Sequence, residues 1–275
     1  MNTSMDPLSV ILLAILQGIT ELFPVSSLGN SVVIPHLLHW NIDPRANTFL
    51  PLLVALHLGT AVALLIYFRQ TWLDLIRSLP AFSPRNPQSR LILLLIVGTI
   101  PAGLIGLIFE KRIAALFGNI QFVAIFLILN GLLLFSGEWL RRRAQSGDVL
   151  TLNYPQAFGI GISQALALLP GFSRSGASLV GGLLTGLSHE AAARFGFLLA
   201  TPIILAAGVL EIPKLLQPDA RGDLVISVVG GLVAGVVAYL STAFLMRYFK
   251  RYEVNALVPF GLYCILLGLA GLLIG

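Results

Sequence analysis

Cysteine and charged residues are both scarce in this sequence. The one cysteine, Cys264, lies in an apolar stretch, which excludes internal disulfides and metal sites built from thiolates. Only 11% of the 275 residues are charged, whereas 57% are hydrophobic. Soluble domains do not have this composition, and it predicts an all-α integral membrane protein. Basic stripes interleaved with aromatic residues are also missing, so the net charge of +5 indicates no nucleic-acid partner.

Several catalytic motifs are missing too. No HExxH, CxxC, GxGxxG or GxxxxGK[ST] pattern occurs, so common zinc, redox, dinucleotide and P-loop sites are not indicated. The residues before the first apolar run include no basic region, and no small-residue cleavage pattern follows it. We therefore expect no removable signal peptide.

What the sequence has in abundance is apolar segments. Six of them are predicted to be spanning helices, because they approach the ~20 residues that a bilayer requires. They cover residues 50–68, 91–109, 120–137, 195–212, 224–245 and 254–274.

Two further segments, 8–38 and 153–187, each contain two short apolar pieces around a polar break. Pieces this short favour re-entrant helix pairs over spans. The arginine-rich loops 69–90, 138–152 and 247–253 are predicted to be cytoplasmic by the positive-inside rule.

Each re-entrant pair is followed by three spans, and an odd number of crossings places the second pair upside down. The chain is therefore predicted to be one membrane domain, 1–275, with inverted-topology repeats at about 1–140 and 150–275. This architecture is common among transporters.

The polar break at 170–178 contains three serines and one arginine, Arg174. Arginine at membrane depth is costly and indicates an anionic partner, for which its planar fork suits phosphate or carboxylate. A helix that starts near Ser175 would direct its free N–H groups at such an anion. The alternative is a polar helix break that only packs against a neighbouring helix.

Inversion would bring Glu21, in the first break, close to Arg174 in the second. Such a pair suits a phosphate site, although it could also be an ion pair that only ties the two halves together. Gln17 lies one helical turn before Glu21, so the two side chains could share a Mg²⁺ or Ca²⁺ ion.

The histidines carry less information. His36 and His39 are predicted to lie at the membrane interface. His57, inside the first span, is predicted to make a hydrogen bond between helices. His189 follows Ser188, which reads as a helix N-cap.

Two motifs resemble those of the bacterial undecaprenyl-diphosphate phosphatase family, the bacitracin-resistance type. Residues 17–27 read QGITELFPVSS, like the family's (Glu/Gln)xxxGlu motif, and residues 170–178 read PGFSRSGAS, like its PGxSRSGA(Thr/Ser) motif. The resemblance covers essentially the whole chain. It implies a multi-pass protein of the bacterial inner membrane that removes the terminal phosphate of undecaprenyl diphosphate, recycling the carrier lipid of cell-wall synthesis. It also implies a divalent metal and a site that faces the periplasm.

The resemblance assigns roles to individual residues. Glu21 corresponds to the essential carboxylate, Ser27 to the proposed nucleophile, and Arg174 with Ser173 to the phosphate ligands. The remaining residues expected to bind substrate are Gln17, Ser26, Ser175, Gly176 and Ser178.

Asn30 departs from the pattern, because the family normally has histidine at this position. Asparagine hydrogen-bonds phosphate but transfers no proton near neutral pH. Either Glu21 carries out all proton transfer, or the enzyme is weakened, in which case Asn30→His should raise turnover. A transporter or flippase of an anionic polyprenyl lipid is the alternative function. The sequence is also compatible with a homodimer.

Overall fold

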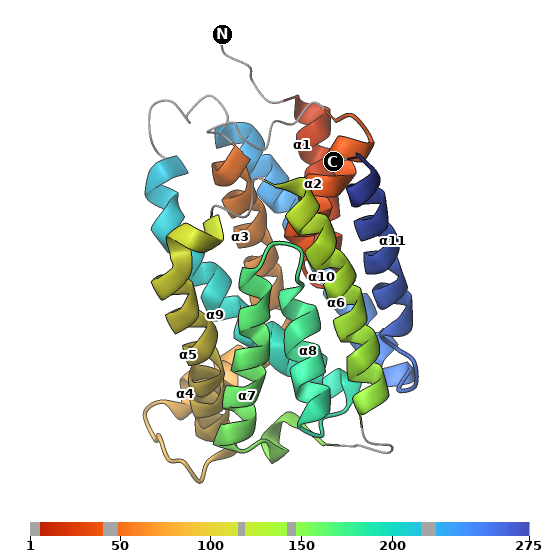
Figure 1. The fold of residues 1–275 in the computed structure, drawn as a ribbon. Helices are drawn as coiled ribbons and strands as arrows, with labels where there is room; N and C mark the ends of the chain where they lie inside the picture. The colour runs from red at the N-terminus through yellow and green to blue at the C-terminus, as the bar shows by residue number, and fades with distance from the viewer. Residues whose placement is uncertain (1–5, 41–48, 115–118, 142–146, 216–223, 275) are drawn as a thin grey trace.

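The computed structural model describes residues 6–40, 49–114, 119–141, 147–215 and 224–274. Within these residues the chain forms eleven α-helices and two 3₁₀ turns, and no strand. The helices run mostly side by side in one elongated bundle (Figure 1). The expected all-α class is confirmed.

The first half begins with a helix, a break and a second helix, and then continues through longer helices. Its elements are α1 (Pro7–Thr20), α2 (Ser27–Leu37), α3 (Phe49–Tyr67), α4 (Arg69–Ser78), α5 (Pro87–Ala114) and α6 (Ile120–Leu140).

The second half has the same beginning. Its elements are η1 (Val149–Thr151), α7 (Tyr154–Ala165), η2 (Leu166–Leu168), α8 (Arg174–Leu184), α9 (His189–Leu215), α10 (Leu224–Arg251) and α11 (Val258–Ile274).

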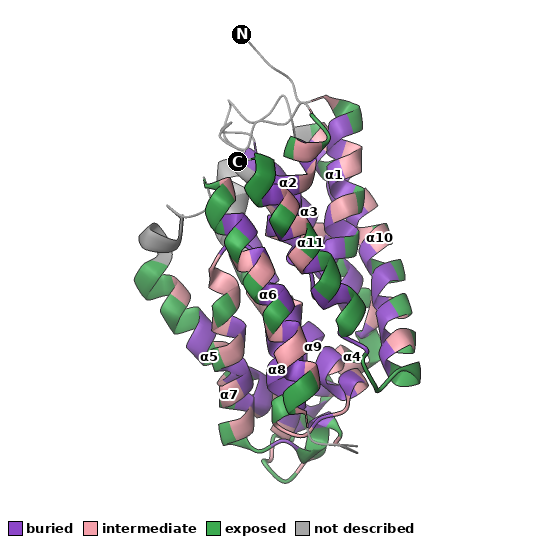
Figure 2. Cartoon of the chain, turned by 45° about the vertical axis from the view of Figure 1, so that its right-hand side comes forward, coloured by how far each residue is buried: buried purple, intermediate pink, exposed green. Residues whose placement is uncertain are grey.

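Three helices within the described residues are long and apolar enough to cross a membrane, and they match three of the six predicted spans: Pro87–Phe109, Ile120–Leu140 and Val225–Arg251. The bent pair α3–α4 would be a fourth. The outward faces of the apolar helices are themselves apolar: Leu107 on α5 is 74% exposed, and Leu273 on the shorter α11 is 88% exposed. Exposed positions run along the outsides of these helices and buried ones face inward (Figure 2). A bilayer is the solvent that such outer faces require.

Two expected boundaries were wrong. Residues 69–90 were predicted to be a loop, but the first ten of them form α4, which bends by 74° from the preceding helix. α4 is amphipathic, with Leu75 buried, and Pro87 does not break structure but begins α5, where its missing N–H costs nothing. The second helix of the first pair, α2, begins at Ser27, inside the polar break and before the second apolar piece, because Ser26 caps it.

The two helix–break–helix units enter the bundle from opposite ends (Figure 1). α7 and α8 lie at the end that also holds α4 and the C-terminal ends of α6 and α10, the arginine-rich segments. α1 and α2 lie at the end with both chain termini (Figure 1). Furthermore, α1 packs on α10 and α7 packs on α5, so each unit contacts the other half. The inverted repeat itself stays a prediction.

Glycine permits one very close helix contact. A Cβ added to Gly59 on α3 would lie 1.9 Å from the carbonyl oxygen of Gly231 on α10. Any side chain at position 59 would therefore separate these helices. Small residues are the usual means of close packing between membrane helices, and this contact holds α3 against the core beside the site.

Candidate active site

The breaks of the two units meet at one cavity of about 390 Å³. Its polar lining comes from Ser26 and Ser27 on one unit and Ser173 and Arg174 on the other, with Glu21 between them. Ser27 and Arg174 are the first residues of α2 and α8. Two helix N-termini therefore converge on one cavity, which is a favourable setting for an anion.

Backbone geometry and a side-chain cap create the first break. After α1 ends at Thr20, the chain turns, and Ser26 adopts φ 63°, a conformation uncommon for a residue with a side chain. The Ser26 hydroxyl then accepts a hydrogen bond from the Gly29 N–H at 3.2 Å. Pro24 precedes this turn and cannot continue a regular helix.

The second break uses glycine instead. Gly171 adopts φ 109°, and a Cβ there would lie 2.5 Å from the Val123 carbonyl oxygen. Ser173 then caps α8 by accepting from the Gly176 N–H at 3.1 Å. The helix predicted to begin near Ser175 thus begins at Arg174, close to the expected position.

A single side chain from α6 holds the two breaks together. The Asn130 amide nitrogen donates to the Pro24 carbonyl oxygen at 3.0 Å, and its amide oxygen accepts from the Ser173 N–H at 3.0 Å. Asn130 is fully buried. The relative position of the two breaks is therefore fixed by hydrogen bonds as well as by packing.

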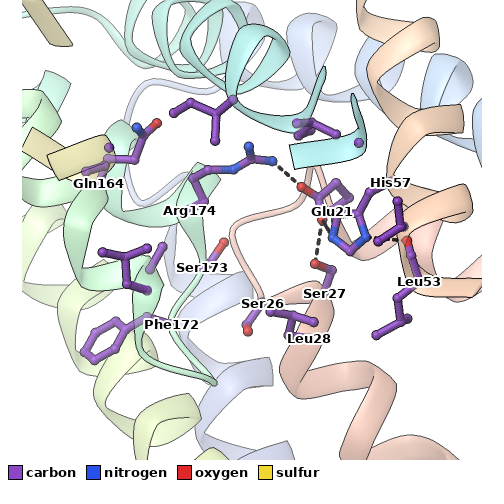
Figure 3. A pocket seen from close by; sticks show the side chains of 18 residues that line it. Glu21, Ser26, Ser27, Leu28, Leu53, His57, Gln164, Phe172, Ser173 and Arg174 are labelled. Atoms are coloured by element: carbon purple, nitrogen blue, oxygen red, sulfur yellow. Dashed lines mark hydrogen bonds and ion pairs between the residues drawn. The ribbon is translucent and has the colours of Figure 1, made fainter. Parts of the chain in front are cut away.

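Glu21 is the centre of the polar contacts. One carboxylate oxygen accepts from the Arg174 guanidinium. The other accepts from the Ser27 hydroxyl at 2.6 Å and from the Gln17 amide nitrogen at 3.0 Å. Figure 3 shows Arg174 and Ser27 reaching this carboxylate from different sides. The predicted Glu21–Arg174 encounter is present, and it lies beside a cavity instead of inside solid packing.

His57 also contacts this carboxylate. Its Nε2 lies 3.2 Å from Glu21 Oε2, and its Nδ1 lies 2.7 Å from the Leu53 carbonyl oxygen (Figure 3). Both partners only accept hydrogen bonds, so both ring nitrogens carry protons when Glu21 is ionised. The pair therefore holds a transferable proton. The expected role of His57, a bond between helices, is too narrow, because the residue lines the cavity.

Comparison with known proteins identifies the family. The family model described as "Bacitracin resistance protein BacA" matches residues 10–270. The chain belongs to this family. The undecaprenyl-diphosphatase 2 of Chromobacterium violaceum is 53% identical over 272 residues, 98% of this chain and 99% of that protein. Undecaprenyl-diphosphatases of Granulibacter bethesdensis and Acidiphilium cryptum are 50% and 51% identical; each alignment covers 98% of this chain, and 97% and 98% of those proteins.

Five of the ten predicted site residues line the cavity of this BacA-family chain: Glu21, Ser26, Ser27, Ser173 and Arg174. The other five, Gln17, Asn30, Ser175, Gly176 and Ser178, do not line it. Some of these five hold in place the residues that do line the cavity. The Ser175 hydroxyl donates to the Phe23 carbonyl oxygen across the two breaks, and the Ser178 hydroxyl donates to the Arg174 carbonyl oxygen.

Asn30 is not brought to the cavity. It is fully buried, and its amide nitrogen donates to the Val25 and Ser26 carbonyl oxygens at 2.9 and 2.8 Å. Its amide oxygen accepts from the Tyr263 hydroxyl. Asn30 thus stabilises the turn that positions Ser26, and its expected contact with phosphate stays a prediction that this geometry does not favour.

Gln17 is the residue predicted to share a divalent cation with the Glu21 carboxylate. Gln17 Oε1 is buried without a hydrogen-bond partner, one helical turn from Glu21. No group of three or more His, Cys, Asp or Glu side chains that could hold a metal occurs among the described residues. Gln17 turns its amide nitrogen, not this oxygen, toward Glu21, and it does not line the cavity. The pair therefore fits a cation only if the Gln17 amide turns over, and then one that completes its coordination with phosphate oxygens, as Mg²⁺ often does.

Proposed function

We propose that this protein hydrolyses undecaprenyl diphosphate to undecaprenyl phosphate and inorganic phosphate, which recycles the carrier lipid of cell-wall synthesis. The names of its relatives support the reaction. The observation that carries the proposal is the 2.6 Å hydrogen bond from Ser27 to Glu21 in a cavity that also presents Arg174. A nucleophile, a base and an anion ligand are thus within reach of one phosphate.

The terminal phosphate binds between the N-termini of α2 and α8. There Arg174 offers a bidentate fork, and it exchanges its contact with Glu21 for the phosphate oxygens. The positive ends of both helices add to the attraction. Because these donors are already in place, they stabilise the charge that develops during transfer.

Ser27 attacks the terminal phosphorus. Its hydroxyl proton passes to Glu21 Oε2 while the bond from phosphorus to the bridging oxygen breaks. The departing group is the lipid phosphate. His57 gives a proton to that group and takes up the Ser27 proton from Glu21, which is thereby ionised again. Water then cleaves the phosphoserine: Glu21 accepts a proton from that water and returns it to the Ser27 oxygen as inorganic phosphate is released.

His57 supplies the proton for the leaving group in this scheme. Held against Glu21 and the Leu53 carbonyl, its ring carries the extra proton on Nε2, inside the cavity. Asn30 has no titratable proton, so His57 is the histidine of this site. The chain therefore needs no histidine at position 30, and the expectation that it is a weakened enzyme no longer follows.

A divalent cation, Mg²⁺ or Ca²⁺, is part of the proposal. Glu21 would hold it together with the diphosphate, and Gln17 would join once its amide turned the unpartnered oxygen toward the ion. Bound there, it would neutralise phosphate charge. Activity should be lost in EDTA and restored by one of these two ions. Full activity in EDTA would exclude the cation.

The bacterial inner membrane, with the site open to the periplasm, is the proposed location. The reason is the grouping of the arginine-rich segments at one end of the bundle. In intact cells an impermeant thiol reagent should label Gln121→Cys and spare Ser83→Cys; Cys264 is buried and gives little background. Labelling of the variant at 83 from outside would overturn this orientation. A homodimer stays a prediction.

Phosphate release by the purified protein from a prenyl diphosphate tests the function. Parent protein should release inorganic phosphate, and Ser27→Ala should not. The names of the three relatives reported above do not support the transporter alternative. Lipid movement without phosphate release would nevertheless overturn the proposal.

A further inference from the structure

Gln164, near the end of α7, is buried and unpartnered. Its side chain is 2% exposed, and neither its amide nitrogen nor its amide oxygen has a hydrogen-bond partner. Among the described residues, no other side-chain amide has both polar atoms buried in this way. A buried polar group without a partner destabilises a protein by ~1–3 kcal/mol. Such a cost suggests that a bound ligand supplies the missing hydrogen-bond partners.

The amide faces the cavity described above, which Gln164 lines together with Arg174. In Figure 3, Gln164 and Arg174 lie on one side of the cavity, while Glu21 and His57 lie on the other. The Arg174–Glu21 ion pair connects the two sides. Gln164 is therefore separated from the nucleophile and base by the phosphate-binding arginine.

The surroundings of Gln164 are apolar and lead outward. Ala167, Leu168 and Gly103 line the cavity with it. Gly103 is exposed on α5, and a Cβ added there would meet nothing within 4 Å. Its neighbour Leu104 is 55% exposed on the same membrane-spanning helix. The cavity thus opens toward lipid on this side, which provides a route for an apolar tail.

We infer that Gln164 binds the inner phosphate, the one that remains on the lipid, and so positions the diphosphate with its terminal phosphate at Ser27. This inference rests on the proposed function. The amide nitrogen donates to oxygens of the inner phosphate, and the amide oxygen accepts from a protonated oxygen or a bound water. The prenyl tail of the bound substrate then extends out of the cavity past Gly103.

This contact changes little during the reaction, because the inner phosphate is not attacked. Interactions of equal strength in the bound substrate and the transition state affect KM and leave kcat largely unaltered. Gln164 is therefore a substrate-positioning residue. The same reasoning predicts that it also holds the lipid phosphate product.

The experiment measures phosphate release from a soluble prenyl diphosphate, farnesyl diphosphate, by the full chain in detergent. Gln164→Met has nearly the same shape but no polar atoms, and it should raise KM about 10- to 100-fold with kcat within about threefold. Gln164→Glu should raise KM further, since it adds negative charge. The matched control is Ser163→Ala on the same helix, whose hydroxyl is already bonded to the Gly159 carbonyl oxygen; it should leave KM unchanged.

Thermal unfolding without substrate separates binding from packing. Gln164→Met should be as stable as the parent or more stable, because no orphaned amide remains buried. A less stable Gln164→Met with unaltered KM would show a packing role and overturn the inference. Unaltered KM in both variants would overturn it as well.

If the parent released no phosphate, the proposed function would fail by itself. A non-cleavable methylene analogue of the prenyl diphosphate still tests the inference in that case. The analogue should raise the melting temperature of the parent and of Ser163→Ala, but raise that of Gln164→Met less. Equal stabilisation of all three would overturn the role of Gln164.

Discussion

The two broken helix pairs are built alike and serve the site differently. Each has a glutamine one or more turns before its break, and each has a serine that caps the second helix. Gln17 donates to Glu21, whereas Gln164 has no partner. In the proposed mechanism, the α1–α2 pair carries the nucleophile and base, and the α7–α8 pair carries the groups that bind the anion. Substitutions in the first should reduce kcat, and those in the second should weaken binding as well.

Glu21→Gln should have the largest effect. It removes the base that accepts the Ser27 proton, so kcat should fall about 10²- to 10⁴-fold. With the divalent cation in excess, KM should change much less than kcat, because the loss of a cation ligand is offset when Arg174 loses its competing partner. Steady-state phosphate release measures both constants, with Asp74→Asn on α4 as a control. A rise in KM as large as the loss in kcat would contradict the division between the two pairs.

Arg174→Lys should follow, with a loss in kcat/KM of about 10²-fold or more, the range for a preorganised donor in an active site. Lysine keeps the charge but not the bidentate fork. It should therefore be nearly as damaging as Arg174→Ala. Activity near that of the parent would rule out bidentate binding of phosphate by this residue.

His57→Gln should reduce kcat by about tenfold, less than is usual for a proton-transfer group, because a lipid phosphate already leaves well. p-Nitrophenyl phosphate, whose leaving group needs no proton, should be affected much less. Equal losses on both substrates would mean that His57 only positions Glu21. Adding Asn30→His to the His57→Gln variant should not restore activity, since position 30 lies outside the cavity.

Ser26→Gly should have the smallest effect. Glycine relieves the positive φ of Ser26 but removes its cap, so stability should change by less than about 0.5 kcal/mol. Ser173→Gly should cost more, because Ser173 has φ −93° and no strain to relieve. Chemical or thermal unfolding in one detergent compares the two. A larger loss at position 26 would reverse this part of the comparison.

Much of this arrangement was readable from the sequence, because it depends on local rules. A polar Pro/Gly/Ser break in apolar sequence, followed by a capping serine, predicts a helix start, and α8 begins beside Ser173. An arginine at membrane depth requires an acid or an anion, and Glu21 was the available acid in the other break. The arginine-rich segments also gather at one end, as the loop charges predicted.

Other features depend on long-range packing and were not readable. His57 is 36 positions from Glu21, in a helix that reads as continuous apolar sequence, and only the contacts of α3 bring it to the carboxylate. The His57 Nδ1–H donates to the Leu53 carbonyl oxygen, four residues earlier on the same helix. Every helical residue has a carbonyl at this spacing, so the sequence did not reveal this bond either. Asn30 was misplaced because a position within a motif does not tell where its side chain points. Its partner Tyr263 comes from the last helix.

Asn130 has a consequence for motion. Because its one amide group bonds to both breaks, the halves of the bundle cannot rock apart without exposing a buried carbonyl oxygen, an N–H group and the amide itself. Alternating access requires such rocking about a central site. The hydrogen bonds of Asn130 therefore oppose this rocking motion. The route past Gly103 inferred above lets the lipid enter from the membrane plane without such rocking, so its exchange should follow the fluidity of the surrounding lipid.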